Sequence, residues 1–309
     1  MKKIVITEFM DPQAVQALAN QADVCYDAAL VDDAPRLLSQ VRDADAVIVR
    51  NRTQMRGELL AACGAVSVIG RLGVGLDNID LAACEARDIR VIAATGANAR
   101  AVAEYVLGTA MLLLRGAYRS TDAVAGGAWP RAALSSGREI GGKTLGLVGF
   151  GDIGRLTATL ARGLGMRVLA CDPMLQPHDA VWAQHGVQAT TLDELLAQAD
   201  VVSLHVPMTS ATRDLLSAQR VAGMKKGAIV INTARGGVAD EAAIAAAIRA
   251  GQLGGAAFDV FEPEPLPAGT SWAGCPNVVL TPHIAGVTAE ANTRVSALIA
   301  AEVARALAL

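Results

Sequence analysis

Short apolar runs alternate with amphipathic segments along residues 3–98 of the chain. The segments between the runs, such as residues 11–20 and 33–41, repeat apolar side chains at helical spacing. Strands that alternate with helices in this way predict an α/β fold with a parallel sheet. The runs that we expect to be strands lie at residues 4–7, 46–49, 66–69 and 89–93.

A long helical pattern interrupts this alternation from residue 98 to about residue 126. Its apolar side chains surround much of the helix circumference, which means that the helix must be covered on more than one side. We expect it either to lie in the core or to be partly buried in a homodimer interface. The alternation then resumes, with strands expected at residues 144–149, 167–171, 201–205, 228–232, 256–259 and 278–280.

Two complete α/β units in 309 residues predict a two-domain protein. We expect two doubly wound parallel-sheet domains of the Rossmann or flavodoxin type, with a cleft between them. Residues 1–98 and 288–309 form one domain in this prediction, because the Ala-rich helix that closes the chain is placed to cross back to the first unit. Residues 99–287 form the other domain.

Charge and composition favour a small-molecule partner. The net charge of −3 gives no general attraction to nucleic acid or to an anionic membrane surface. The longest apolar run, residues 105–114, has about half of the ~20 residues that span a bilayer. The five cysteines form no C-x-x-C pair and the four histidines no H-x-x-x-H spacing, from which we expect reduced thiols and no metal site. The first residues run directly into a strand, and we expect a cytoplasmic protein.

A Gly-rich sequence connects the strand at residues 144–149 to a helix. It reads Gly149-Phe150-Gly151-Asp152-Ile153-Gly154, and a strand before G-x-G-x-x-G with a helix after it is the context of a dinucleotide-binding loop. Gly149 permits the tight turn, Gly151 leaves room for a pyrophosphate, and Gly154 lets helix and strand pack closely. The first helical residues, Asp152 and Ile153, offer N–H groups to the phosphates. An ordinary strand-to-helix turn is the alternative interpretation.

A carboxylate follows the next expected strand. Asp172 comes directly after residues 167–171, where a dinucleotide-binding domain holds the adenosine ribose. The following residues, Pro173, Met174 and Leu175, provide no cation for the 2′-phosphate of NADP. The cofactor that we predict is therefore NAD.

Three later segments each place ionisable residues after an apolar strand. Together with the Gly-rich loop they closely resemble the D-isomer-specific 2-hydroxyacid dehydrogenase family over nearly the whole chain. This resemblance implies hydride transfer between NAD(H) and a small 2-hydroxy or 2-oxo acid. These three segments are residues 231–237, 257–266 and 280–286, and residues 202–207 and the Gly-rich loop complete the set.

The resemblance implies a catalytic trio of Arg235, Glu264 and His283. Reduction of a 2-oxo acid places negative charge on the carbonyl oxygen, and an imidazolium can give that oxygen its proton. Glu264 would orient His283 and favour its charged form. Arg235 would hold the substrate carboxylate and stabilise the developing oxyanion.

The resemblance also implies contacts to the cofactor. Asp259 is expected at the nicotinamide carboxamide and Thr233 at the nicotinamide ribose. His205 and Pro207 are expected to line the cofactor site, although a packed histidine at a strand end is an equal alternative for His205.

In the first domain the segment 70–80 resembles the substrate loop of the family. The backbone N–H groups of Val74 and Gly75 would bind the substrate carboxylate there, since glycine allows close backbone approach. Asn98 begins the helix that follows, and it either caps this helix or contacts the ligand.

One stretch departs from the common family pattern. Arg50 and Arg52 stand two residues apart, on one face if the strand continues through them, where relatives often have one arginine. Two cations suggest a second anionic group on the substrate, and the stretch is similar to that of the sulfolactate dehydrogenases within the family. The D geometry of the family is named (S) for 3-sulfolactate, because sulfur outranks the carboxyl oxygens. A solvated basic loop is the alternative.

Other functions stay open at this stage. Phosphoglycerate dehydrogenase and hydroxypyruvate or glyoxylate reductase are alternative activities within the family. An NADH-sensing, corepressor-like binding protein is the alternative outside enzymes.

Overall fold

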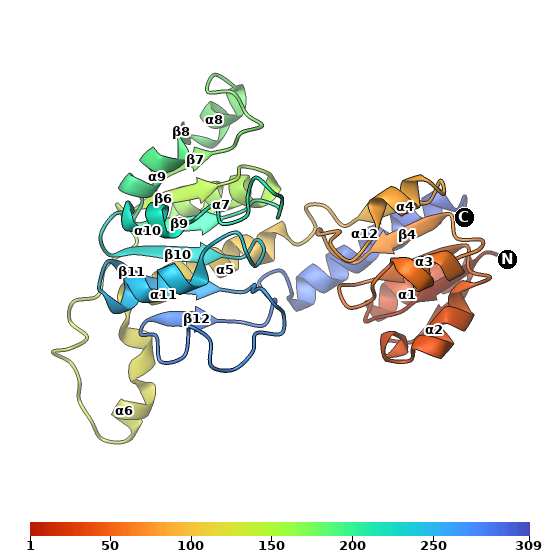
Figure 1. The fold of residues 1–309 in the computed structure, drawn as a ribbon, viewed down its shortest axis with the longest axis horizontal. Helices are drawn as coiled ribbons and strands as arrows, with labels where there is room; N and C mark the ends of the chain where they lie inside the picture. Colours follow the sequence, from red (N-terminus) through yellow and green to blue (C-terminus); the bar gives the residue numbers. More distant parts are fainter. The chain divides into compact units, whose positions relative to one another are not determined.

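In the computed structural model the structure describes the backbone of residues 1–309 and every side chain except that of Arg119. The chain forms two compact units, Met1–Asn98 with Val287–Leu309 and Ala99–Gly286. Both contain a fully parallel sheet with helices on its faces (Figure 1), which confirms the predicted α/β class. None of the helices in the part of the chain that the structure describes is long and apolar enough to cross a membrane.

The first unit has a five-stranded sheet of order β2-β1-β3-β4-β5. Its strands are β1 (Lys3–Ile6), β2 (Asp23–Tyr26), β3 (Ala46–Val49), β4 (Val68–Arg71) and β5 (Arg90–Ala93). Its helices are α1 (Pro12–Ala19), the short η1 (Leu30–Asp32), α2 (Ala34–Val41), α3 (Gly57–Ala62), α4 (Leu81–Glu85) and α12 (Ala289–Ala306). β2 was not predicted, because this edge strand is only half-buried and its residues show no apolar run.

Alternating side chains of the strands build two core layers in this unit. Ile4 and Ile6 of β1 pack with Ile299 of α12 on one face of the sheet. Val5, between them, packs on the other face with residues of α2 and α3 such as Leu37. The last helix of the chain therefore completes the core of the first unit, although it follows the second unit in sequence.

The second unit has a seven-stranded sheet of order β12-β11-β10-β9-β6-β7-β8. Its strands are β6 (Thr144–Val148), β7 (Arg167–Cys171), β8 (Gln188–Ala189), β9 (Val201–Leu204), β10 (Ala228–Asn232), β11 (Leu253–Phe258) and β12 (Val278–Leu280). Its helices are α5 (Ala99–Arg115), the short η2 (Ala117–Ser120), α6 (Thr121–Ala125), α7 (Asp152–Gly163), α8 (Ala180–His185), α9 (Leu192–Gln198), α10 (Ala218–Ala222) and α11 (Glu241–Arg249).

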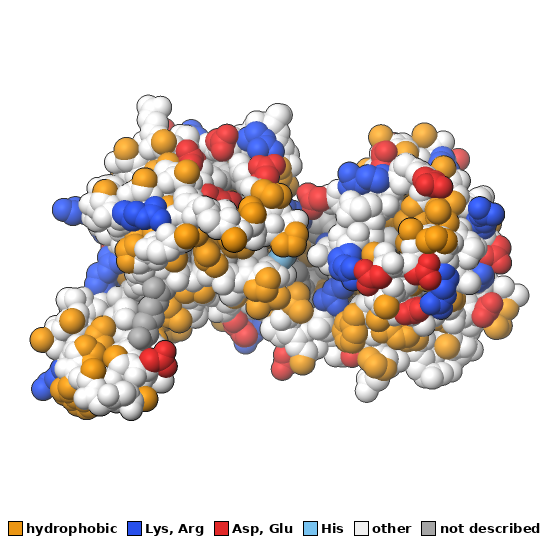
Figure 2. Space-filling model, turned by 60° about the horizontal axis from the view of Figure 1, so that its bottom comes forward, with side chains coloured by type: hydrophobic (Ala, Val, Ile, Leu, Met, Phe, Trp, Pro, Cys, Tyr) orange, Lys and Arg blue, Asp and Glu red, His pale blue; other side chains and the backbone are white. Residues whose placement is uncertain are grey.

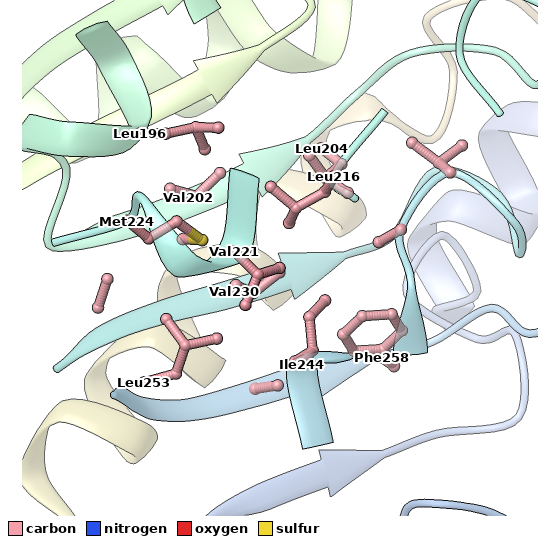
Figure 3. Packing of buried hydrophobic residues seen from close by; sticks show 14 of the residues in the cluster. Leu196, Val202, Leu204, Leu216, Val221, Met224, Val230, Ile244, Leu253 and Phe258 are labelled. Carbon is pink, nitrogen blue, oxygen red and sulfur yellow. The ribbon is translucent and has the colours of Figure 1, made fainter. Parts of the chain in front are cut away.

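The strand order of this sheet reverses between β6 and β9. Open parallel sheets bind ligands beyond the carboxyl ends of their strands at such a reversal. The core on one side of the sheet is apolar, with Val202 and Val230 packed against Ile244 and Phe258 (Figure 3). This buried layer supports the strands whose ends carry the candidate site.

The long helix expected at residues 98–126 is shorter than predicted. α5 ends at Arg115 because Gly116 adopts a left-handed conformation with φ of 67°, the usual backbone signal for a helix end. α6 then forms a separate short helix that stands away from the sheet of its unit (Figure 1). The apolar pattern continued through Gly116, and for this reason it concealed the break.

Candidate active site

The Gly-rich loop lies at the reversal of strand order, between β6 and α7. Gly149 has a left-handed φ of 97°, and a Cβ at this residue would lie 2.5 Å from the carbonyl oxygen of His205. A Cβ at Gly154 would lie 2.5 Å from the carbonyl oxygen of Gly149. At Gly151, in contrast, a Cβ would meet no described atom within 4 Å. Two glycines thus permit close backbone packing, and the third leaves open space before the N-terminus of α7, where Asp152 and Ile153 form the first turn.

Asp172 follows β7 and points to the Gly-rich loop. Its Oδ2 accepts a hydrogen bond from the backbone N–H of Phe150 at 2.8 Å, and its Oδ1 accepts one from Met174 at 2.9 Å. Each carboxylate oxygen has a further lone pair, and the side chain is only partly buried. The carboxylate can therefore still accept hydrogen bonds from the hydroxyl groups of a ribose.

His205 stands at the end of β9 and packs against the same loop. Its backbone N–H donates to the carbonyl oxygen of Val148 at 2.7 Å, and its Nε2 lies 3.0 Å from the hydroxyl of Ser203. Burial lowers the pKa of His205 to about 4, and the imidazole is therefore neutral at pH 7. These contacts are those of a packed strand-end histidine, and a role for His205 and the exposed Pro207 toward the cofactor stays a prediction.

The structure brings Glu264 and His283 into contact. His283 Nδ1 lies 2.8 Å from Glu264 Oε2, and the two side chains are 40% and 36% exposed. Glu264 Oε1 accepts a hydrogen bond from the backbone N–H of Phe261 at 3.0 Å, which fixes the carboxylate on its own loop. The pair is therefore both oriented and accessible.

Arg235 lies on the loop after β10. Its Nη1 donates to the carbonyl of Ala234 at 2.6 Å. Asn232, which is buried, accepts from the N–H of Ala234 at 3.0 Å and donates to the carbonyl of Arg235 at 2.9 Å. A Cβ at Gly236 would lie 2.1 Å from the backbone of Phe261, and this close approach joins the Arg235 loop to the Glu264 loop. The three residues of the predicted trio thus follow three adjacent strands, β10, β11 and β12.

Thr233 and Asn98 each hold a buried oxygen without a hydrogen-bond partner among the described residues. Such atoms are uncommon in folded proteins, and a bound ligand is one way of satisfying them. Thr233 stands two residues before Arg235, and its hydroxyl is expected to contact the nicotinamide ribose. Asn98 Oδ1 does not cap α5, which leaves ligand contact as the prediction for this residue.

Asp259 is buried and bonds to the loop that carries His283. It is 1% exposed, and its carboxylate accepts hydrogen bonds from the N–H groups of Ile284 and Ala285, each at 2.8 Å. It also accepts from the hydroxyl of Thr281 at 2.6 Å. The residue therefore fixes the loop of His283, a role that sequence reasoning missed. Among the described residues Oδ2 accepts only the bond from Ala285 and has a lone pair left. The predicted contact of Asp259 to the nicotinamide carboxamide stays a prediction.

The predicted substrate loop follows β4 in the first unit. Val74 is exposed and Gly75 is partly exposed. Arg71, at the end of β4, donates from Nη1 to the carbonyl of Leu72 at 2.9 Å, and its guanidinium lies over Gly73.

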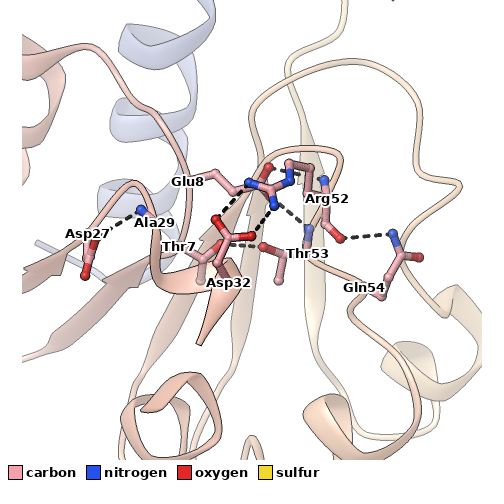
Figure 4. A network of polar contacts seen from close by, with 8 residues as sticks. All are labelled: Thr7, Glu8, Asp27, Ala29, Asp32, Arg52, Thr53 and Gln54. Atoms are coloured by element: carbon pink, nitrogen blue, oxygen red, sulfur yellow. Dashed lines mark hydrogen bonds and ion pairs between the residues drawn. The ribbon is translucent and has the colours of Figure 1, made fainter. Parts of the chain in front are cut away.

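Arg50 and Arg52 lie on a loop that a buried carboxylate holds. Glu8, 3% exposed, accepts from the backbone N–H groups of Arg50 at 2.9 Å, Thr53 at 3.0 Å and Arg52 at 3.2 Å. Figure 4 shows part of this network beside the ion pair of Arg52. The strand does not continue through these residues, since β3 ends at Val49.

The two guanidinium groups have different partners and do not share a face of a strand. Arg50 Nη2 donates to Asn292 Oδ1 at 2.7 Å, its Cζ lies 5.8 Å from the centre of the Phe9 ring, and burial lowers its pKa. Arg52 forms an ion pair with Asp32 in which the side chains are 57% and 58% exposed. The hydrogen bond to Asp32 raises the pKa of Arg52. Among the residues whose side chains the structure describes, no group of three or more His, Cys, Asp or Glu could hold a metal ion.

The chain is similar to proteins of one family. Residues 107–285 match the family described as D-isomer specific 2-hydroxyacid dehydrogenase, NAD binding domain. The chain is 52% identical over 307 residues to (S)-sulfolactate dehydrogenase of Chromohalobacter salexigens, with 99% of each protein covered. It is 39% identical to D-3-phosphoglycerate dehydrogenase of Mycobacterium bovis, of which it spans only 57% of the length.

A solved structure has the same fold. The TT0316 protein of Thermus thermophilus superposes with a TM-score of 0.86 at 34% identity, covering 96% of this chain and 94% of that one. The likeness extends through both units and is not confined to the Gly-rich loop.

Proposed function

Because the chain belongs to the D-isomer-specific 2-hydroxyacid dehydrogenase family, and is thus an NAD-dependent oxidoreductase of 2-hydroxy acids, we propose that Arg235, Glu264 and His283 carry its reaction. The observation that supports this assignment is the 2.8 Å contact between His283 Nδ1 and Glu264 Oε2 on adjoining strand-end loops. We further propose a dianionic substrate, (S)-3-sulfolactate or its 2-oxo acid.

Several features of the second unit fit NAD. The open space at Gly151, the N–H groups at the start of α7 and the close packing at Gly149 and Gly154 suit a pyrophosphate. Asp172 would hold the adenosine ribose. The unpartnered hydroxyl of Thr233 suits the nicotinamide ribose. When bound, NAD supplies the acceptor or donor of hydride.

His283 and Glu264 would move the proton. With Nδ1–H donated to Glu264, the imidazole has Nε2 left to exchange a proton with the substrate oxygen. Glu264 also stabilises the imidazolium that reduction needs, because the carboxylate and the cation attract each other across this hydrogen bond.

Arg235 would stabilise the charge that develops on the carbonyl oxygen. A single preorganised donor of this kind lowers the activation free energy by roughly 3 kcal/mol. Asn232 fixes the backbone on both sides of Ala234, and this limits the positions that the guanidinium can reach. Val74 and Gly75 would bind the substrate carboxylate with their backbone N–H groups, and Asn98 would contact the ligand.

The second anionic group of the substrate is the more specific part of the proposal. The relative that is 52% identical over nearly all of both proteins is named (S)-sulfolactate dehydrogenase. Arg50 and Arg52 supply two cations on one anchored loop, and a sulfonate matches the planar donor fork of a guanidinium. Phosphoglycerate is the alternative substrate, supported by the relatives that are named for it.

A substrate panel tests the proposal. Sulfopyruvate, phosphohydroxypyruvate, oxaloacetate, hydroxypyruvate and glyoxylate are each followed by NADH absorbance, with NADPH in parallel. We expect sulfopyruvate to have the highest kcat/KM and NADH to be preferred, because Asp172 repels a 2′-phosphate. Equal efficiency with glyoxylate and sulfopyruvate would remove the dianionic substrate and leave a general 2-oxo acid reductase.

Arg52→Ala gives the sharper version of this test. If Arg52 binds the second anion, kcat/KM for sulfopyruvate falls by roughly 30- to 1000-fold, whereas that for glyoxylate changes little. Arg36→Ala is the matched control, because Arg36 also forms an exposed ion pair, with Asp27 at 2.6 Å. An unchanged ratio of the two efficiencies in Arg52→Ala contradicts the assignment.

We also propose a homodimer formed around α5 and the segment after it. This segment exposes large apolar side chains, Tyr118, Val124 and Trp129, the last of them 77% exposed. Figure 2 shows apolar side chains over much of the lobe at its lower left, which contains α6. Light scattering at micromolar concentration should give the mass of a dimer, and a monomer mass would contradict the proposal. The cytoplasmic location stays a prediction.

A further inference from the structure

The backbone of His283 has an unusual conformation for a residue other than glycine. Its φ of 56° lies in the left-handed region. Residues with a Cβ hold this conformation only where the surrounding structure fixes it, and such positions gather at functional sites. The contacts that hold this loop therefore decide where the imidazole lies.

Asp259 provides most of these contacts. Its carbonyl oxygen accepts from the backbone N–H of His283 at 2.8 Å, and its carboxylate accepts from the next two N–H groups, those of Ile284 and Ala285. Thr281, two residues before His283, donates its hydroxyl proton to Asp259 Oδ1 at 2.6 Å. One buried residue thus holds the loop on both sides of the histidine.

A tyrosine on another element extends this network. The hydroxyl of Tyr105, on α5, lies 2.6 Å from Thr281 Oγ1. Thr281 has one hydroxyl proton and gives it to Asp259, and for this reason Tyr105 must be the donor to Thr281. Burial raises the pKa of Tyr105, which keeps its hydroxyl protonated and able to donate at neutral pH. The direction of the relay is Tyr105 to Thr281 to Asp259.

We propose that Tyr105 is a positioning residue for His283 and acts through Thr281 and Asp259. The proposal rests on the proposed function, in which His283 exchanges the proton with substrate. Tyr105 completes the hydrogen bonding of Thr281, which in turn holds the carboxylate of Asp259 in the orientation that fixes the His283 loop. Without the tyrosine hydroxyl the loop is held less firmly, and Glu264 meets the imidazole less often.

Three substitutions isolate the hydroxyl groups. Tyr105→Phe removes one oxygen atom and is expected to lower kcat by roughly 3- to 10-fold, with the KM of the 2-oxo acid within twofold of wild type. Thr281→Val keeps the shape of the side chain but removes the donor to a carboxylate, and should lower kcat by roughly 10- to 100-fold. Thr281→Ser restores the hydroxyl and should restore kcat.

Tyr26→Phe is the matched control. Tyr26 belongs to the first unit, where its half-buried hydroxyl donates to the carbonyl of Met10 at 3.4 Å. We expect this variant to keep the wild-type kcat. If Thr281→Val does not fold, Tyr105→Phe still decides, because a buried phenyl ring fills nearly the same volume.

A spectroscopic measurement tests the positioning without turnover. The chain has four histidines, and the signals of His283 in a long-range ¹H–¹⁵N correlation spectrum are those that His283→Gln removes. At a pH where the imidazole is neutral, we expect a single tautomer with the proton on Nδ1 in the wild type. Tyr105→Phe should give a mixture of tautomers, and Tyr26→Phe should not.

The two readouts separate the possible failures. A lower kcat in Tyr105→Phe together with mixed tautomers of His283 supports the proposal. A change in either readout alone, or in neither, overturns it when the wild type is active. If the wild type reduces none of the 2-oxo acids, the proposed function fails, and the tautomers alone then decide whether Tyr105 positions His283.

Discussion

Two loops in different units are built around the same device, a buried carboxylate that accepts several hydrogen bonds. Asp259 follows β11 and holds the loop after β12, its neighbour in the sheet. Glu8 follows β1 and holds the loop after β3, which is likewise its neighbour. Carboxyl ends of adjacent parallel strands lie close together, and an acid after one strand can therefore bind the backbone after the next.

The side chains carried by these loops differ in how firmly they are held. His283 is joined to Glu264, which is itself bonded to its own loop. Arg52 is joined to Asp32 only at the surface, and exposed ion pairs of this kind contribute little to stability. If His283 and Arg52 act as proposed, the proton-transfer group is already oriented by its contacts, whereas Arg52 can exchange Asp32 for an anion of the substrate at small cost.

The largest effect is expected from loss of the preset imidazole. His283→Gln should lower kcat by roughly 10²- to 10⁴-fold, because general acid–base catalysis contributes that much. NADH binding, followed by its fluorescence, should stay near the wild-type affinity. His178→Gln, at an exposed position, is the control. A loss below tenfold would mean that His283 is not the proton donor.

The carboxylate behind the histidine comes next. Asp259→Asn turns one acceptor oxygen into an amide N–H₂ that faces a backbone donor. A buried donor left without a partner costs about 1–3 kcal/mol of unfolding free energy, and kcat should fall by at least tenfold as the loop loosens. Urea unfolding and NADH turnover measure the two effects. Asp193→Asn, which affects only an exposed ion pair with Arg220, should change neither.

The cofactor loop could be predicted from sequence because its signal is local. Gly149, Gly151 and Gly154 lie within six residues; the structure shows close backbone packing at Gly149 and Gly154 and open space at Gly151. The order of apolar runs likewise predicted both sheets except for the edge strands β2 and β8. The end of α5 was missed because the apolar pattern runs on past Gly116, although a glycine in the left-handed conformation is a regular helix terminator.

The hydrogen bonds by which Glu8 and Asp259 hold the two loops could not be predicted in the same way. Glu8 and Thr53, like Asp259 and Ala285, are far apart in sequence, and only the sheet register brings them together. An acid that follows an apolar strand was a usable signal in both cases, but it does not say whether the acid binds a ligand or the neighbouring loop. For Asp259 the structure shows the contacts to the loop, and the contact to the cofactor stays a prediction.

The matching substitution in the first unit should act on specificity. Glu8→Gln keeps Oε1 as the acceptor for Arg50 and Thr53 but presents an amide N–H₂ to the N–H of Arg52. We expect a loss of about 1–3 kcal/mol in unfolding free energy and roughly a tenfold fall in kcat/KM for sulfopyruvate. The value for glyoxylate should stay within twofold. An equal fall for both substrates would show that Glu8 serves the fold alone.

The smallest effect is expected at the exposed ion pair. Asp32→Asn leaves the backbone of the Arg52 loop on Glu8 and removes only the charge that competes with a substrate anion. The melting temperature should move by no more than about 2 °C, because exposed pairs are screened by solvent. The kcat/KM for sulfopyruvate should rise by roughly 2- to 5-fold, since Arg52 no longer has to leave a carboxylate. Asp27→Asn, which breaks the similar pair with Arg36, should leave that efficiency unchanged. A fall for sulfopyruvate in Asp32→Asn would show that Asp32 holds Arg52 in its working position, and the contrast between a preset imidazole and an exchangeable guanidinium would then be wrong.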